Sequence, residues 1–355
     1  MTPRLLAIGA AAIGSTVLAA CVWGGEADAL PTAPAPAATS TRTTAATGET
    51  PAAPTTQTPA TGQAPRQPGG ALPGVGGPGT RPSTLTPDET VTFCEPVDGV
   101  ELLMDVYYPE GHTGDSNAPA IVYVHGGGWT AGTRTAGEGI RYIPSLLDAG
   151  FVVFAVDYRL APEYEFPAHI QDVQCGVRYI RANAGDFGID PDRIGAIGGS
   201  AGGQLVNLLG TAEDGDFELV GGYEGFSSEV SVVVSMFGAS DFSDPNMDTH
   251  NEAHTRVFGE DTTTDEATDP LSLASAVNYI SSDDADFLLM HGEEDPVVPI
   301  SQSEIFEAAL SDAGVDVTFV RVENAGHGFA PTGGTPNPTA SALIELVAEF
   351  FSDHL

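Results

Sequence analysis

The hydrophobic residues of this chain are concentrated in short, β-branched runs that recur beyond residue 84. Each run is apolar on both alternating faces, which is typical of strands buried inside a parallel sheet rather than strands with one face in water. The pattern predicts strands over residues 120–125, 151–157, 193–198, 230–237, 287–291 and 315–322.

Between these runs, apolar residues recur at the spacing of helices. The pattern predicts helices over residues 167–184, 201–210, 301–314 and 341–355. Pro167 suits a first helical turn, Ser301 and Glu304 have the spacing of a capping box, and Gly314 suits a helix end. Strands that alternate with helices predict an α/β domain, in which a mostly parallel central sheet is flanked by helices.

The first part of the chain has a different pattern. Residues 1–20 form a short apolar run behind one cation, Arg4, and predict a secretory signal. The run ends in Leu-Ala-Ala-Cys21, which is similar to the bacterial lipoprotein motif, so we expect lipidation at Cys21. An ordinary signal peptide with an incidental cysteine is the alternative. Residues 21–83, mostly Pro, Ala, Thr and Gly, bury too little apolar surface to fold and predict a disordered tether.

Residues 84–355 suit one sizeable domain with a single core. The chain holds 49 acidic and 12 basic residues, a net charge of −37, and among the acids only Glu26, Asp28 and Glu49 precede residue 84. Such a field repels nucleic acid and anionic membranes, so we expect no nucleic-acid partner and membrane contact through the lipid alone. The prediction is an exported protein, lipid-anchored to a membrane or cell surface and otherwise periplasmic or secreted.

A glycine-rich stretch surrounds one hydroxyl, Ser200. Residues 198–202, Gly-Gly-Ser-Ala-Gly, match G-x-S-x-G between the predicted strand 193–198 and the predicted helix 201–210, the context of a nucleophile elbow. In so tight a turn, a Cβ two residues before or after the serine would collide with the adjacent backbone. The sequence therefore predicts a strained serine nucleophile raised above the edge of the sheet.

A serine hydroxyl needs a base and an acid that orients the base. In hydrolases with this elbow, the chain order is Ser, then Asp or Glu, then His. Asp295 follows the strand 287–291 and His327 follows the strand 315–322, so both are expected beside Ser200 at the carboxyl ends of parallel strands.

The oxyanion of an acyl-transfer reaction needs hydrogen-bond donors. Consecutive glycines in VHGGGW, residues 124–129, leave backbone N–H groups that a substrate can approach. The N–H groups of Gly127, Gly128 and Ala201 are the predicted oxyanion hole, and His125 is expected to brace the loop.

Five motifs follow one another in a familiar order: HGGGW (125–129), DYRLAPE (157–163), DPDRIGAIGGSAGG (190–203), HGEEDPVVP (291–299) and AGHGF (325–329). Together they resemble the hormone-sensitive-lipase-type esterases, and especially the carboxylesterases that include feruloyl and acetyl-xylan esterases. The resemblance implies an α/β-hydrolase fold, ester hydrolysis through an acyl-enzyme and no cofactor, with Ser200, Asp295 and His327 at the catalytic positions. Larger members carry a helical cap before the HGGG strand, whereas residues 84–119 have a strand pattern here, so a small or absent cap is expected.

Other polar residues suggest rival sites. Asp241, after the strand 230–237, is a second candidate acid, but the HGxxD setting favours Asp295. His250 and His254 have i, i+4 spacing, yet the glutamate between them is misplaced for H-E-x-x-H and no third ligand is evident. We therefore expect no metal.

The remaining candidates are structural. Cys94 and Cys175 are expected to pair in an exported protein, with two unpaired buried thiols as the alternative. His169 and His291 are expected to be structural, and Trp129 to pack beside the oxyanion loop.

The function predicted from these residues is that of a serine carboxylesterase. An amide-cleaving relative, a small peptidase or a formamidase, is the nearest rival, and a non-catalytic binding module is the rival from another class. The insertion between residues 237 and 286 is acidic and poor in large apolar residues. It predicts an open site for short acyl esters of a neutral alcohol, either a small molecule or a polysaccharide-linked group. The sequence does not indicate the oligomeric state.

Overall fold

The computed structural model describes residues 85–247, 252–259 and 269–355. The predicted signal and tether, with Cys21, lie outside the described residues, as does His250. All described residues belong to one compact unit, which begins at residue 73. None of the described helices is long and apolar enough to span a membrane.

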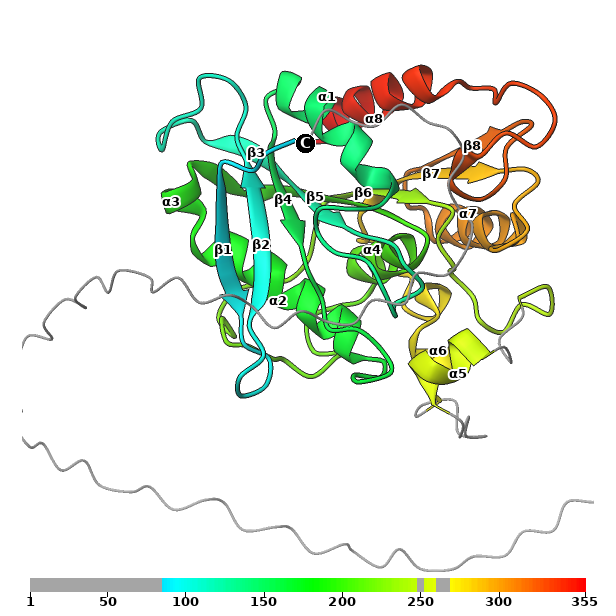
Figure 1. Ribbon diagram of the computed structural model, residues 1–355, viewed down its shortest axis with the longest axis horizontal. Coiled ribbons are helices and arrows are strands. Elements are labelled where there is room, and N and C mark those ends of the chain that lie inside the picture. Colours follow the sequence, from blue (N-terminus) through cyan, green and yellow to red (C-terminus); the bar gives the residue numbers. More distant parts are fainter. Residues whose placement is uncertain (1–84, 248–251, 260–268) are drawn as a thin grey trace, which may run out of the picture. The chain divides into compact units, whose positions relative to one another are not determined.

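A central sheet organises the domain (Figure 1). Its strands are β1 (Glu89–Cys94), β2 (Leu102–Tyr107), β3 (Ala118–Val124), β4 (Val152–Val156), β5 (Ile189–Gly199), β6 (Val232–Met236), β7 (Asp286–Gly292) and β8 (Val317–Val322). The strands lie in the order β1-β2-β4-β3-β5-β6-β7-β8. β1 and β2 are antiparallel, β2 is antiparallel to β4, and all other neighbours are parallel. The predicted mostly parallel sheet is confirmed, with the six predicted strands as β3 to β8.

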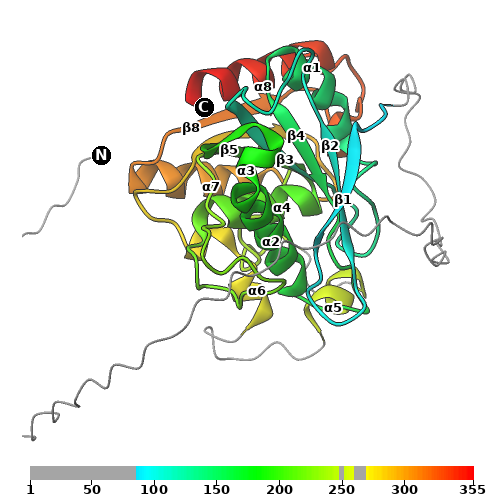
Figure 2. The same ribbon diagram turned by 90° about the vertical axis from the view of Figure 1, so that its left-hand side faces the viewer.

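Helices cover both faces of this sheet (Figures 1 and 2). One face is covered by the 3₁₀ turn η1 (Glu138–Tyr142), α1 (Ile143–Asp148) and α8 (Ala340–His354). The other is covered by α2 (Ala168–Ala182), α3 (Ala184–Phe187), α4 (Ala201–Thr211) and α7 (Ser301–Ala313). The described residues thus form the three-layer α/β sandwich that the alternation of strands and helices predicts.

The side chains of β3 show why the strands are apolar throughout. Ala120, Val122 and Val124 pack into the core on the α2 and α4 side, whereas Ile121 and Tyr123 pack into the core on the α1 and α8 side. Because helices cover both faces, neither set of alternating side chains meets water.

Helix α7 corrects one prediction. Its N-cap is Ile300, not Ser301, and no side chain caps the first turn, so the predicted capping box is wrong. The Ser301 hydroxyl donates instead to Asp244 Oδ2 at 2.6 Å. The helix ends at Gly314 with a left-handed backbone, φ +88°, as predicted.

The segment between β6 and β7 contributes only short helices among its described residues. These are α5 (Glu252–Phe258), α6 (Pro270–Leu273) and η2 (Ala276–Asn278). Phe242 and Phe258 from this segment pack around the Trp129 indole, with ring centroids 6.2 and 5.7 Å away. The few large apolar residues of the insertion are therefore used to attach it to the domain.

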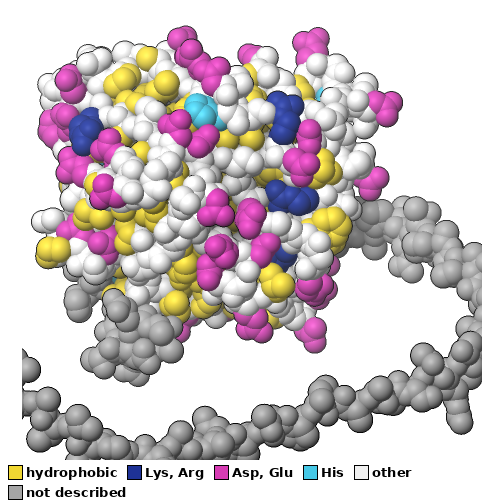
Figure 3. Space-filling model, turned by 180° about the vertical axis from the view of Figure 1, so that it is seen from behind, with side chains coloured by type: hydrophobic (Ala, Val, Ile, Leu, Met, Phe, Trp, Pro, Cys, Tyr) yellow, Lys and Arg dark blue, Asp and Glu magenta, His cyan; other side chains and the backbone are white. Residues whose placement is uncertain are grey.

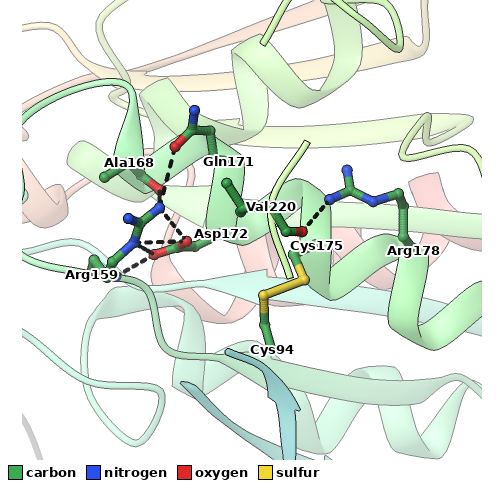
Figure 4. Close-up of polar contacts among 8 residues, drawn as sticks. All are labelled: Cys94, Arg159, Ala168, Gln171, Asp172, Cys175, Arg178 and Val220. Carbon is green, nitrogen blue, oxygen red and sulfur yellow. Dashed lines mark hydrogen bonds and ion pairs between the residues drawn. A yellow bond between two sulfur atoms is a disulfide. The ribbon is translucent and has the colours of Figure 1, made fainter. Parts of the chain in front are cut away.

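Figure 4 shows how the end of β1 is fastened to α2. Cys94 at the end of β1 and Cys175 in α2 form a disulfide. Gly221 presses against it, because a Cβ there would collide with both sulfur atoms. Arg178, one turn after Cys175, donates to Val220 O at 3.0 Å and so holds the same loop.

On the face of the domain that Figure 3 shows, carboxylates are the most frequent charged side chains. Arg159 and Arg178 are buried, so these two arginines do not offset the carboxylates at the surface. The acidic field expected from composition is therefore displayed to solvent.

Candidate active site

Ser200 occupies a sharp turn between the end of β5 and the start of α4. Its backbone has φ +57° and ψ −121°, a conformation that non-glycine residues rarely adopt. The turn is held from both sides, since Ser200 N donates to Met236 O at 2.9 Å and Gln204 N donates to Ser200 O at 3.0 Å. Strain of roughly 1–3 kcal/mol is sustained where the surrounding structure fixes the backbone in this way.

The flanking glycines are required by close backbone approach. A Cβ at Gly198 would collide with Gly202 O, and a Cβ at Gly202 would collide with Val124 O. The same Cβ would lie 2.7 Å from His125 O. The second of these glycines therefore lets α4 begin directly against the loop that follows β3.

Three side chains from three loops meet at the carboxyl end of the sheet. His327 Nε2 lies 3.0 Å from Ser200 Oγ, and His327 Nδ1 lies 2.8 Å from Asp295 Oδ2. The structure thus places the predicted serine, histidine and aspartate in one hydrogen-bonded line. The acid is fully buried, whereas the His327 side chain is 16% exposed, so the line runs from the interior toward solvent.

Asp295 lies in a tight turn after β7 that turns backbone N–H groups toward its carboxylate. Val297 N and Val298 N donate to Oδ1 at 2.8 and 3.0 Å. Burial alone would raise the pKa of Asp295, but hydrogen bonds from His291, His327 and the backbone outweigh burial and hold the pKa well below its usual range. The acid is therefore ionised wherever a hydrolase of this kind operates.

An aromatic pair packs against the His327 imidazole. The Phe237 ring meets His327 edge-to-face at 4.8 Å between centroids, and Phe329 packs on Phe237 at 5.0 Å. These contacts limit rotation of the imidazole about its own hydrogen bonds.

The glycine loop after β3 has the conformation that an oxyanion hole requires. Gly127 and Gly128 have φ values of +131° and +58°, and a Cβ at Gly126 would lie 2.7 Å from Gly199 O. Across the described residues, the backbone N–H groups of Gly127, Gly128 and Ala201 have no protein acceptor. These N–H groups remain available to a substrate oxygen.

His125 packs against this loop and supports it. It is buried and stacks on the Tyr158 ring at 4.2 Å, and its Nδ1 lies 2.8 Å from Gly126 O. The Tyr158 hydroxyl donates to His125 O at 2.9 Å. Burial lowers the pKa of His125, so the imidazole is neutral and acts in packing.

Sequence reasoning assigned no role to Arg134, which lies a few residues after the glycine loop. Its Nε lies 2.9 Å from Asp105 Oδ1, and its NH1 lies 2.7 Å from Asp157 Oδ2. The Arg134 backbone N–H also donates to Asp157 Oδ1 at 2.7 Å. The arginine therefore ties the segment after the glycine loop to the ends of β2 and β4.

The rival acid Asp241 lies apart from the line of Ser200, His327 and Asp295. The Asp241 carboxylate accepts hydrogen bonds from Ser243 N and Ser243 Oγ, at 2.8 and 2.6 Å, and has no contact with His327. His254 packs among the aromatic rings around Trp129. In the part of the chain that the structure describes, no group of three His, Cys, Asp or Glu side chains could hold a metal ion.

Comparison with known proteins decides the family. The family model described as BD-FAE matches residues 104–310, more than half of the chain. The chain belongs to the BD-FAE family. The resemblance drawn from the five sequence motifs is thereby confirmed.

Curated relatives of this BD-FAE chain are named esterases. "Esterase LipQ" of Mycobacterium tuberculosis is 30% identical over 261 residues, covering 72% of this chain and 59% of the relative. "Esterase LipC" of the same organism is 34% identical over 235 residues, covering 64% of this chain and 57% of the relative. The aligned part of this chain thus spans less than two thirds of the length of either relative.

Solved structures share the fold. A truncated carbohydrate esterase from gut microbiota superposes with a TM-score of 0.59 at 28% identity, over 76% of this chain and 97% of that one. The propionate-bound form of an esterase from Thermogutta terrifontis gives a TM-score of 0.62 at 25% identity, over 75% and 93%. The BD-FAE chain therefore has the α/β-hydrolase fold that its motifs imply.

Sequence reasoning did not predict one set of contacts behind the acid at this BD-FAE site. His291, expected to be structural, lies directly behind Asp295, and Ser303 of α7 lies behind His291. His291 is the histidine of the HGxxD motif, but the sequence does not indicate which part of Asp295 it contacts.

Proposed function

We propose that this protein hydrolyses carboxylic esters through an acyl-enzyme formed on Ser200. The observation that carries the proposal is the hydrogen-bonded line from Ser200 Oγ through His327 to Asp295, at 3.0 and 2.8 Å. The names of the curated relatives support the same reaction type.

Acylation begins when the Ser200 oxygen attacks the ester carbonyl while His327 Nε2 accepts the hydroxyl proton. Asp295 accepts the hydrogen bond from His327 Nδ1–H and stabilises the imidazolium that forms. The N–H groups of Gly127, Gly128 and Ala201 donate to the oxyanion of the tetrahedral intermediate. His327 then returns the proton to the departing alkoxide, and the alcohol leaves.

Deacylation repeats these steps with water. His327 Nε2 takes a proton from the water that attacks the acyl-serine, and the carboxylic acid leaves as Ser200 regains its proton. Apart from the substrate and water, the scheme uses only residues of the chain.

The proposed substrates are short acyl esters, acetate to butyrate, of a neutral alcohol such as a plant-wall sugar. The short helices α5 and α6 and the packed state of Phe242 and Phe258 offer little material for a long acyl channel. Carboxylates on the surface disfavour anionic substrates. The likeness to a carbohydrate esterase and to a propionate-bound esterase points the same way.

Replacing the nucleophile tests the reaction. Ser200→Ala should lower kcat on p-nitrophenyl acetate by about 10⁶-fold while leaving the circular dichroism spectrum and Tm unchanged, since loss of a triad serine has this size elsewhere. Substantial hydrolysis by pure, folded Ser200→Ala protein would refute the acyl-enzyme.

A chain-length series tests the substrate class. The kcat/KM values for p-nitrophenyl esters should be highest at two to four acyl carbons and fall beyond, and acetylated xylan should be deacetylated. For an ester and an amide of the same acyl group, the kcat/KM value should be higher for the ester. A maximum at ten or more carbons would show a lipid pocket and overturn the short-acyl assignment.

The proposed location is outside the cytoplasm, with the chain anchored through lipid at Cys21. The support is the motif at the end of the apolar run, residues 1–20, followed by residues 21–83 as a spacer. Cys21→Ser should release activity from the membrane fraction or block processing. An unmodified mature N-terminus at another residue, found by mass spectrometry, would contradict the anchor.

A further inference from the structure

His291 lies at the end of β7, four residues before the acid Asp295, with none of its side chain exposed. Its Nε2 lies 2.9 Å from Val298 O and 3.5 Å from Asp295 Oδ2. Its Nδ1 lies 2.7 Å from Ser303 Oγ on α7. Both ring nitrogens are therefore engaged, one toward the acid turn and one toward the helix behind it.

These contacts determine where the proton of His291 resides. Val298 O is a carbonyl and only accepts, so Nε2 must carry a hydrogen to bond it. Asp295 Oδ2 lies 3.5 Å from the same nitrogen. The Ser303 hydroxyl both donates and accepts, so it can donate to Nδ1 and leave the imidazole neutral.

The carboxylate of Asp295 is consequently surrounded by donors on both oxygens. Oδ1 receives the backbone N–H groups of Val297 and Val298, and Oδ2 receives His327 Nδ1 with His291 Nε2 beside it. Without the imidazole of His291, Oδ2 would keep His327 as its side-chain partner and would lose the second imidazole beside it.

We propose that His291 is a positioning residue for the triad, held by Ser303 as the neutral Nε2–H tautomer so that it fixes the Asp295 carboxylate against His327. This inference rests on the proposed function of the triad. It places two further residues behind the line from Ser200 to Asp295: His291, whose Nε2 lies 3.5 Å from Asp295 Oδ2, and Ser303, which is hydrogen-bonded to His291. The first turn of α7 thereby helps to set the angle at which the acid meets the proposed base.

The tautomer is measured directly by ¹⁵N NMR of the full chain labelled at histidine, with the His291 signals assigned by their loss in His291→Gln. At neutral pH, Nε2 should be protonated and Nδ1 unprotonated. A protonated Nδ1, with or without a proton on Nε2, would overturn the assignment. The measurement needs no substrate, so it stands even where the esterase proposal fails.

The positioning role is tested by a pair of variants at His291. His291→Gln keeps an N–H donor near the place of Nε2, and His291→Leu removes it. His291→Leu should lower kcat roughly 10-fold with KM unchanged, since misplacing a catalytic group by a fraction of an ångström has effects of this order. His291→Gln should recover most of the loss. Equal losses in both, or a loss confined to KM, would overturn the role.

A second pair tests the anchor on α7 and remains informative where His291→Leu fails to fold. Ser303→Ala removes the donor to Nδ1, and Ser303→Thr keeps a hydroxyl there. Ser303→Ala should lower kcat about 3-fold, within the range of one lost neutral hydrogen bond, and Ser303→Thr should not. Unchanged kcat in Ser303→Ala would contradict the relay.

The control is His112→Gln, which disturbs the hydrogen bond of an imidazole to Phe187 O, at 2.8 Å, away from the triad. It should leave kcat unchanged. Ser200→Ala separates the two proposals. Where wild type and Ser200→Ala are equally inactive, the proposed function fails. Where the wild type is an active esterase but the His291 tautomer is reversed, only the positioning role fails.

Discussion

Asp295 and Asp172 are both buried carboxylates that accept several hydrogen bonds, and their surroundings move their pKa values in opposite directions. Asp172 in α2 faces Arg159, whose Nε lies 2.8 Å from Oδ2 and whose NH2 lies 2.8 Å from Oδ1 (Figure 4). Burial nevertheless outweighs the arginine and raises the pKa of Asp172. At Asp295, burial is outweighed by the imidazole and backbone donors, and the pKa is lowered.

The two carboxylates differ in whether a neighbouring group neutralises their negative charge. Arg159 neutralises Asp172, so this pair holds α2 to the loop after β4 and has no charge to offer a third group. Backbone N–H groups orient Asp295 without cancelling its charge, and His327 is the partner that gains a proton during the proposed reaction. A carboxylate fixed by neutral donors suits chemistry, whereas one fixed by a guanidinium suits packing.

The largest expected effect comes from neutralising the catalytic acid. Asp295→Asn should lower kcat by about 10⁴-fold, because the amide favours the wrong imidazole tautomer and leaves the imidazolium uncompensated. Stopped-flow or steady-state hydrolysis of p-nitrophenyl acetate measures it. Asp241→Asn is the matched control and should retain activity, and a reversed ranking would reassign the acid.

Neutralising the other carboxylate should affect folding instead. Asp172→Asn leaves the Arg159 guanidinium buried without a counter-charge and should lower the free energy of unfolding by roughly 3–5 kcal/mol. Urea titration gives this value, and kcat per folded molecule should stay near wild type. A large fall in kcat with unchanged stability would erase the distinction between the two carboxylates.

Removing the disulfide tests whether the attachment of β1 to α2 affects catalysis as well as stability. Cys94 and Cys175 are 81 positions apart, and opening a loop of that length should cost about 4 kcal/mol in the chain-entropy account. The Cys94→Ser/Cys175→Ser variant should therefore unfold at lower denaturant with kcat retained below its transition. Free-thiol titration of the native protein should find neither cysteine reduced.

A third buried ionisable group, His169, lies one turn before Asp172 in α2. Burial lowers the pKa of His169 to about 4, so the unfolded chain binds a proton that the folded protein excludes as pH falls from about 6.5 toward 4. Stability should fall over that interval by roughly 3 kcal/mol from this group. His169→Leu should show a shallower decline between these pH values in thermal melts, and an unchanged slope would contradict the assignment.

Much of the site could be predicted because its signals are local. The glycines around Ser200 reflect backbone collisions within a few residues, and Asp295 and His327 each follow an apolar strand. Parallel strands then bring these loops to one end of the sheet. The HGxxD pattern separated Asp295 from Asp241, whose carboxylate is occupied by Ser243.

The features that the sequence did not predict, or left open, depend on contacts between residues from different elements of the fold. Ser301 has the spacing of a capping residue, but Asp244, 57 positions earlier, offers its hydroxyl an ionised acceptor. The contact of His291 with Ser303 requires α7 to pack on β7 in one particular register. Whether Cys94 and Cys175 pair depends on the separation of β1 and α2, which places their Cα atoms 6.4 Å apart.

The glycine pressed against the disulfide has a kinetic consequence. Cys94 and Cys175 are almost wholly enclosed, and the backbone of Gly221 covers both sulfur atoms. An attacking thiolate must approach along the axis of the bond that it breaks, so it cannot react until the loop carrying Gly221 lifts away. The lifetime of this crosslink in a reducing medium is therefore limited by the fraction of time for which that loop is open, which is set by a local unfolding equilibrium.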